Sequence, residues 1–249
     1  MQAILLICFL IIQVNNFLSS KRNLEDLSDD IIILHLNDVH CGVNDNIGYD
    51  GFVLYRDELY EKYPNIISVD VGDHIQGGTL GSISEGSAII NIMNKVGFDV
   101  AILGNHEFDY GIDQLSKLGE TITSKYISSN FCYKKNKTSV YNPYKIIEKG
   151  GKKIAFIGVL TPLTFSKTYL STLRDSNGDA IYDFLTGNNT QELYDRVQEN
   201  VNKVRKEEGA DYVILLTHIG MELEQYTSDK LLSKIENVDA VLDGHTHLI

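Results

Sequence analysis

The sequence is poor in cysteine and in basic residues. Of its three cysteines, only Cys41 and Cys132 lie beyond the first twenty residues. These two can form at most one disulfide, and two free thiols are an equally good interpretation, so a disulfide-built scaffold is excluded. There are 22 Lys and Arg against 34 Asp and Glu, which gives a formal net charge of −12. Because phosphate contacts dominate nucleic-acid affinity, this charge and the lack of a basic cluster argue against a nucleic-acid partner.

The sequence also lacks any apolar run long enough to span a bilayer. An apolar run at residues 3–12 is too short, and Ser19 and Ser20 supply small residues near a cleavage point. We therefore predict a signal peptide over residues 1–20, export to the cell exterior or surface, and no transmembrane segment in the mature chain. No basic residue precedes the apolar run and Leu18 is large for its position, so an uncleaved anchor or a buried strand is the alternative.

Repeats, low-complexity tracts and linkers are absent as well. With 43% hydrophobic residues, the 249-residue chain can bury a large core, and we interpret residues 21–249 as one domain. The sequons Asn136-Lys-Thr138 and Asn188-Asn-Thr190 are compatible with an exported glycoprotein. The glycine-rich segment 72–81 is expected to be a turn, and it is no nucleotide-binding P-loop because it lacks a Gly-Lys-Ser/Thr ending.

Apolar runs and amphipathic segments alternate along the chain. Strands are expected at residues 31–36, 66–71, 100–103, 126–129, 212–216 and 240–242, with a hairpin at 144–148 and 153–160. Helices are expected at residues 51–63, 85–96, 113–121, 190–208 and 228–235. This alternation predicts an α/β fold with a mostly parallel, helix-covered sheet and an antiparallel or mixed portion. The periodicity is too weak to assign an element to residues 161–188.

Five of the expected strands are followed directly by side chains that can bind metal. These side chains are Asp38, His40, Asp73, Asn105, His218, His245 and His247. Because the carboxyl ends of strands are where open α/β sheets bind ligands, we expect one metal site there. In extended geometry Asp38 and His40 would point to one side, and His245 and His247 repeat their spacing, so each pair is expected to bind an ion.

This set contains more ligands than one ion needs. A tetrahedral zinc takes four ligands, whereas two ions roughly 3.5–4 Å apart that share a carboxylate would use all of them. No thiolate is required, so zinc, manganese, iron and cobalt are all candidates. Bound cations would also supply the positive charge that an acidic protein needs in order to handle phosphate.

These strand-end segments resemble the five sequence blocks of the calcineurin-like metallophosphoesterases. The blocks are Asp38-x-His40, Gly72-Asp73, Gly104-Asn-His-Glu107, Thr217-His218 and Gly244-His-Thr-His247. Leu34-His-Leu-Asn-Asp-Val-His40 and Gly104-Asn-His-Glu-Phe-Asp109 are most similar to the N-terminal catalytic domain of the secreted 5′-nucleotidases. The resemblance implies a four-layer αββα sandwich of two mixed sheets, incomplete at its C-terminus.

The resemblance also implies a role for each of these residues. Asp38, His40 and His247 would hold one divalent metal ion, Asn105, His218 and His245 a second one, and Asp73 would bridge the two. A water activated by the two metals would attack phosphorus in line. His106 would stabilise the charge that builds on the phosphoryl group, and Asp109 would orient its imidazole. The implied activity is hydrolysis of phosphomonoesters, chiefly nucleoside 5′-monophosphates, in nucleotide catabolism.

Several alternatives stay open. The same scaffold suits hydrolysis of nucleotide sugars, cyclic nucleotides or sulfur esters. The chain ends two residues after His247, whereas the family's catalytic domain continues and 5′-nucleotidases add a C-terminal nucleotide-binding domain. A non-catalytic, truncated metal-binding fragment is therefore the alternative from another class.

We interpret His35 as a packed histidine, and for His74 a loop role is at least as good as a place at the site.

Overall fold

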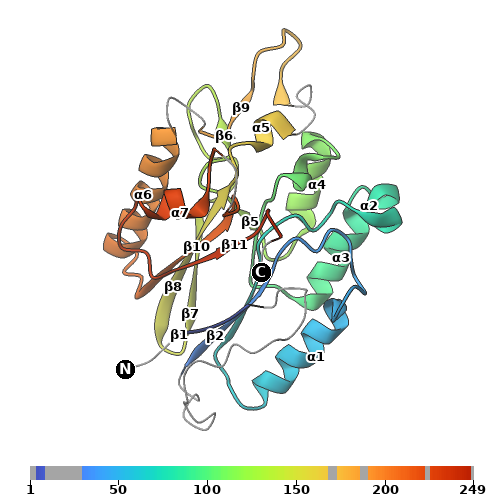
Figure 1. Ribbon diagram of the computed structural model, residues 1–249, viewed down its shortest axis with the longest axis vertical. Coiled ribbons are helices and arrows are strands. Elements are labelled where there is room, and N and C mark those ends of the chain that lie inside the picture. The colour runs from blue at the N-terminus through green and yellow to red at the C-terminus, as the bar shows by residue number, and fades with distance from the viewer. Residues whose placement is uncertain (1–3, 9–29, 168–172, 186–189, 222–224, 248–249) are drawn as a thin grey trace.

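The computed structural model describes residues 4–8, 30–167, 173–185, 190–221 and 225–247 (Figure 1). One sheet has five strands in the order β1-β2-β3-β4-β5, and every pairing in it is parallel. Its strands are β1 (Ile4–Cys8), β2 (Ile31–Leu36), β3 (Ile66–Asp70), β4 (Val100–Ile102) and β5 (Tyr126–Ile127).

The second sheet has four strands in the order β11-β10-β8-β7, and it is mixed. β7 (Tyr144–Lys149) and β8 (Lys152–Leu160) form the expected antiparallel hairpin. β10 (Tyr212–His218) pairs in parallel with both β8 and β11 (Ala240–Asp243). A small antiparallel pair, β6 (Cys132–Tyr133) and β9 (Tyr182–Asp183), lies apart from the two sheets.

Helices cover the outer face of each sheet (Figure 1). On one side lie α1 (Gly48–Tyr60), α2 (Gly78–Ser84), α3 (Ser87–Val96) and α4 (Ile112–Thr121). On the opposite side lie α6 (Gln191–Lys206) and α7 (Ser228–Leu232). Two further helices of the described residues are α5 (Thr164–Lys167) and a short 3-10 helix, η2 (His106–Phe108). The expected α/β class and its four layers are confirmed.

The layers follow from how successive residues of β2 are buried. Ile31 and Ile33 pack between the two sheets, whereas Ile32 and Leu34 pack beneath the helices of the first sheet. A parallel strand covered on both faces needs apolar residues without alternation, which explains the continuous run of residues 31–34. The apolar stripe of α6 is likewise core, because four of its residues are buried in the cluster over the second sheet: Leu193, Val197, Val201 and Val204.

The glycine-rich segment departs from the expected turn, because α2 begins at Gly78. Glycine has a low helix propensity, so no helical pattern is visible in this segment. Tertiary contact requires the glycine instead: a Cβ at Gly81 would lie 2.7 Å from the Ile75 carbonyl oxygen and even closer to Cys41 Sγ. The elements β6, β9, α2, α5 and η2 are too short to be recognised by periodicity.

Within the predicted signal peptide, the structure describes only β1. This strand pairs in parallel with β2, from Ile4 opposite Ile31 to Cys8 opposite His35. Such pairing is possible for an uncleaved chain and does not test cleavage, so the signal peptide stays a prediction. In the described part of the chain, no helix combines the length and the apolar character needed to cross a membrane.

Candidate metal centre

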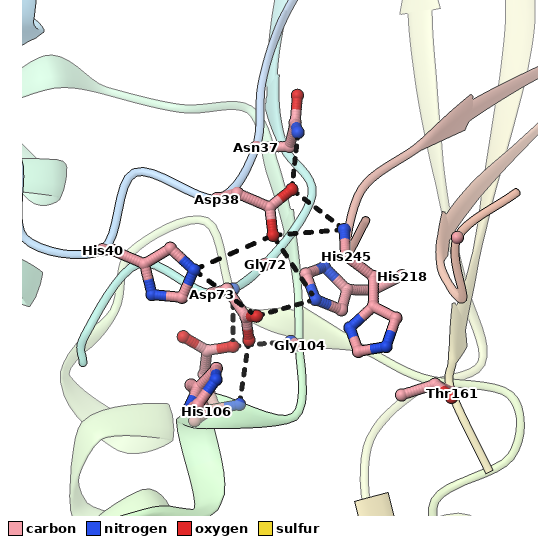
Figure 2. A network of polar contacts seen from close by, with 12 residues as sticks. Asn37, Asp38, His40, Gly72, Asp73, Gly104, His106, Thr161, His218 and His245 are labelled. Atoms are coloured by element: carbon pink, nitrogen blue, oxygen red, sulfur yellow. Dashed lines mark hydrogen bonds and ion pairs between the residues drawn. The ribbon is translucent and has the colours of Figure 1, made fainter. Parts of the chain in front are cut away.

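Five of the predicted ligands converge where the carboxyl ends of strands from both sheets meet (Figure 2), namely Asp38, His40, Asp73, His218 and His245. Asp38, His40 and His247 form one group, in which the ligand atoms all lie within 4.8 Å of one another. His40 Nε2 lies 3.2 Å from His247 Nε2, and His247 Nε2 lies 3.3 Å from Asp38 Oδ1. Residues from the two ends of the chain thus form one cluster of nitrogen and oxygen donors.

Asp73, His218 and His245 form a second group of the same kind. His218 Nε2 lies 2.9 Å from Asp73 Oδ2 and 3.7 Å from Asp38 Oδ1. Asp73 Oδ2 is also 3.8 Å from His40 Nε2. The Asp73 carboxylate therefore lies between the two groups, as expected of a shared ligand.

The local geometry of these ligands differs from the extended backbone expected for the two His-containing pairs. Asp38 and His40 have φ of 52° and 44°, and His245 and His247 have φ of 87° and 51°. These left-handed turns also separate His245 from His247, which lie in different groups. The two histidines are therefore grouped as the family resemblance implies, and not as the pair that extended backbone would give. Asp73 is left-handed too, with φ of 57°, so strained backbone is concentrated at the site.

Hydrogen bonds orient two of the imidazoles toward the carboxylates. His40 Nδ1 lies 3.1 Å from Gln76 Oε1, and His218 Nδ1 lies 2.7 Å from the carbonyl oxygen of Val71. Both partners are acceptors, so each Nδ1 carries a proton and each Nε2 faces the centre, where its lone pair would be available to a cation that displaces the Nε2 proton. The sequence contains no periodic pattern that identifies Gln76 as an orienting residue.

The charges at the centre call for a cation. Burial alone would raise the pKa of Asp73, but the neighbouring His218 and the His106 backbone N–H lower that pKa well below its usual range. Burial would lower the pKa of His218, but the Asp73 carboxylate raises it well above its usual range. Among the described residues no Lys or Arg pairs with Asp38 or Asp73. A protonated His218 compensates Asp73, and a divalent cation would supply positive charge to both carboxylates.

Asn105 supplies an independent test of whether the donor set fits a metal. Its side chain is almost fully buried, and its Oδ1 has no hydrogen-bond partner among the described residues. A buried amide oxygen without a partner is costly, so an ion beside it would satisfy it. The preceding Gly104 packs directly on Asp73, since a Cβ at Gly104 would lie 2.6 Å from the Asp73 backbone nitrogen. The residues present therefore fit a site with nitrogen and oxygen ligands.

His106 projects from η2 beside the two groups (Figure 2). Its Nδ1 lies 2.7 Å from Asp109 Oδ2, and its backbone N–H donates to Asp73 Oδ1 at 2.8 Å. The Asp109 carboxylate raises the pKa of His106, which favours the charged imidazolium. The ring centroid lies 5.2 Å from that of His40, and the side chain is 36% exposed. This imidazole can therefore reach a molecule that enters from solvent.

The other buried histidines lie outside the two groups. His74 Nδ1 lies 2.8 Å from Asp70 Oδ1, and His74 Nε2 lies 2.8 Å from the Tyr126 hydroxyl. Burial would lower the pKa of His74, but Glu107 and Asp70 raise it to about 9, so it serves as their buried counter-charge. Burial lowers the pKa of His35 to about 4, which leaves it neutral and packed between the sheets.

Comparison with known proteins places the chain among phosphoesterases. The family model described as calcineurin-like phosphoesterase matches residues 31–248. The chain is 29% identical to a snake venom 5′-nucleotidase of Gloydius brevicauda, over 88% of this chain and 37% of that protein. It is 26% identical to a 2′,3′-cyclic-nucleotide 2′-phosphodiesterase/3′-nucleotidase of Salmonella typhimurium, again over 88% and 37%. The chain thus spans little more than a third of the length of these relatives.

A solved structure shares the fold. The calcineurin-like phosphoesterase YfkN from Bacillus subtilis superposes with a TM-score of 0.70 at 28% identity, over 87% of this chain and 72% of that chain. Calcineurin-like phosphoesterases use divalent metals, and the two groups of donors lie within the matched residues. Since the family model covers most of the sequence, the chain belongs to the calcineurin-like phosphoesterase family.

Proposed function

We propose that this chain is the catalytic domain of a two-metal phosphoesterase that hydrolyses phosphomonoesters. The observation that carries the proposal is the pair of adjacent donor groups on either side of Asp73, with the His106 imidazole beside them. Asp38, His40 and His247 would hold one divalent ion, and Asn105, His218 and His245 the other. Asp73 would contact both.

The metals and the protein would divide the chemistry between them. When bound, two divalent cations supply Lewis acidity and lower the pKa of water at the site. His106 would donate a hydrogen bond from Nε2 to an oxygen of the phosphoryl group, because its Nδ1 is committed to Asp109. Asp109 would keep the His106 ring in place and hold a proton on its Nδ1.

A nucleoside 5′-monophosphate is the substrate that we favour. The chain resembles proteins named as 5′-nucleotidases, and the partly exposed His106 imidazole can reach a terminal phosphate. Cyclic nucleotides are the second candidate, because the Salmonella typhimurium relative is named for cleaving them.

Phosphate release tests this proposal. The chain, loaded with Mn²⁺ or Zn²⁺, should release phosphate from AMP and from an aryl phosphomonoester, and a chelator should stop both reactions. Faster turnover of a 2′,3′-cyclic nucleotide would favour the second candidate. If the folded, metal-loaded chain left every substrate intact, the non-catalytic fragment would be the better interpretation.

We also propose that the protein is exported and glycosylated at Asn136. The side chain is exposed, and its Oδ1 accepts a hydrogen bond from the Thr138 backbone N–H in a surface turn. The second sequon begins at Asn188, which lies outside the described residues.

When the gene is expressed in eukaryotic cells with its own N-terminus, we expect secreted protein that begins near residue 21. A glycosidase should reduce its mass, and Asn136→Gln should reduce that shift. Intracellular protein that retains residues 1–20 would contradict export.

A further inference from the structure

Glu107 is a fully buried carboxylate that belongs to neither donor group but is bonded to the loops that carry them. Its Oε2 accepts hydrogen bonds from the backbone N–H groups of Gly104 and of Asp73, the latter at 2.8 Å. Its Oε1 accepts from the backbone N–H groups of His74 at 2.9 Å and Ile75 at 3.3 Å. One carboxylate therefore ties the Asp73 loop to the segment that leads into Asn105.

Asp243 has the same arrangement at the second sheet. Its Oδ1 accepts hydrogen bonds from the Thr217 hydroxyl at 2.8 Å and from the backbone N–H groups of Ile219 at 3.2 Å and Gly220 at 3.3 Å. Its Oδ2 accepts from the Ser228 hydroxyl. These donors flank His218 on both sides. Because Asp243 ends β11 two residues before His245, it links the two histidines of the second group.

Both carboxylates therefore act on the same group, Asp73, His218 and His245. In the first group, by contrast, no carboxylate from outside accepts a backbone N–H of Asp38, His40 or His247 among the described residues. Asp73 and His245 have left-handed backbone, with φ of 57° and 87°. Strained residues persist only where their surroundings over-determine them, and hydrogen bonds to a charged carboxylate are strong ones.

We propose that Glu107 and Asp243 are positioning residues that preset one donor group from its two sides and thereby set the affinity of one of the two ions. This inference rests on the metal-binding part of the proposed function. Neither carboxylate would touch substrate or metal. Each would act through the backbone of the loops that carry the ligands.

The test compares metal binding by Glu107→Gln and Asp243→Asn with the unaltered chain. Both variants keep the side-chain shape but place an NH₂ group where a backbone or hydroxyl donor expects an acceptor. The matched control is Asp99→Asn. Asp99 Oδ2 accepts the Ser68 backbone N–H at 2.8 Å, just before β4 begins and therefore at the opposite edge of the first sheet.

Mn²⁺ titration by calorimetry, with folding checked by circular dichroism, gives the readout. We expect the unaltered chain and Asp99→Asn to bind two ions. In both variants one ion should bind roughly 10- to 100-fold more weakly. The other ion should keep its affinity within about 2-fold in Asp243→Asn, and in Glu107→Gln it should weaken less than the first ion does, because Asp73 is shared. A fall in kcat that excess Mn²⁺ restores, with KM little changed, would support the same conclusion. A merely structural role would lower the melting temperature, as in the control, without separating the two affinities.

Two results would overturn the inference: both ions weakened equally, or both unaffected in the variants. If Glu107→Gln does not fold, Asp243→Asn decides alone. Asp243 is only partly buried, so its substitution should disturb folding less than that of the fully buried Glu107. An unaltered chain that binds no Mn²⁺ would also overturn it. An unaltered chain that binds two ions without releasing phosphate would contradict only the proposed activity.

Discussion

Asp73→Ala should lose metal and reduce phosphate release to the background of the assay, whereas His106→Ala should keep both ions and lose activity alone. Asp73 lies between the two groups, 2.9 Å from His218 Nε2 and 3.8 Å from His40 Nε2. Its removal leaves two neighbouring imidazole clusters without their shared negative charge, so each ion loses affinity.

His106 differs because its imidazole is bonded to Asp109 and belongs to neither group. The loss of one hydrogen-bond donor to developing charge lowers kcat by about 10²–10³-fold in comparable sites. We therefore expect a fall of about that size in kcat for His106→Ala, with a small change in KM and two ions still bound.

Metal content by atomic spectrometry, measured beside phosphate release, separates the two variants. The control is Asp50→Ala, because Asp50 is an exposed carboxylate in the first turn of α1 and should change neither quantity. Equal metal loss in Asp73→Ala and His106→Ala would refute the role given to His106. Full metal content in Asp73→Ala would refute the shared-ligand role.

Gly104→Ala should disrupt the centre although it removes no ligand. The added Cβ would lie 2.6 Å from the Asp73 backbone nitrogen and 2.7 Å from Asp73 Cγ, distances that real Cβ atoms essentially never show. Asp73 cannot move away easily, because its backbone is bonded to Glu107 and its carboxylate to the His106 N–H. We expect at least about a 100-fold loss of activity together with weaker metal binding, as for other displaced metal ligands.

Gly97→Ala is the matched control for this substitution. Gly97 follows α3 with φ of 78°, and a Cβ there would meet nothing within 4 Å. The left-handed backbone makes this variant less stable by about 1 kcal/mol, measured as the free energy of unfolding in urea. Its metal content and kcat should match those of the unaltered chain. Activity close to normal in Gly104→Ala would mean that the Asp73 loop yields to the extra methyl group.

Much of the candidate centre could be predicted because its residues directly follow strands. A continuous apolar run such as residues 31–36 is a local property, and so is the Asp38-Val-His40 segment that follows it. The carboxyl edges of parallel strands meet in space, so strand order along the chain was enough to place these residues at one site. The family resemblance then implied how the ligands divide between two ions.

The elements that the sequence did not predict depend on contacts between distant residues. In α2, Gly81 leaves room for the Cys41 side chain, and the two-residue strand β6 pairs with β9, 51 residues farther along at Cys132 and Asp183. Hydrophobic periodicity reports whether a residue is buried, but it does not identify the partner that buries it.

The sequence by itself therefore determined the α/β class, the strand-end candidates for metal ligands and the family. Only the tertiary structure showed the left-handed backbone that turns the side chains of His245 and His247 toward the different groups that the family resemblance implies. It also decided that the His245 N–H donates to Asp38, a contact between residues 207 positions apart. The tertiary structure also decided that Glu107 and Asp243 accept hydrogen bonds from the loops that carry the candidate ligands. The physical reason is that the sequence shows where a carboxylate stands, whereas its hydrogen-bond partners depend on which strand ends lie next to each other within a sheet.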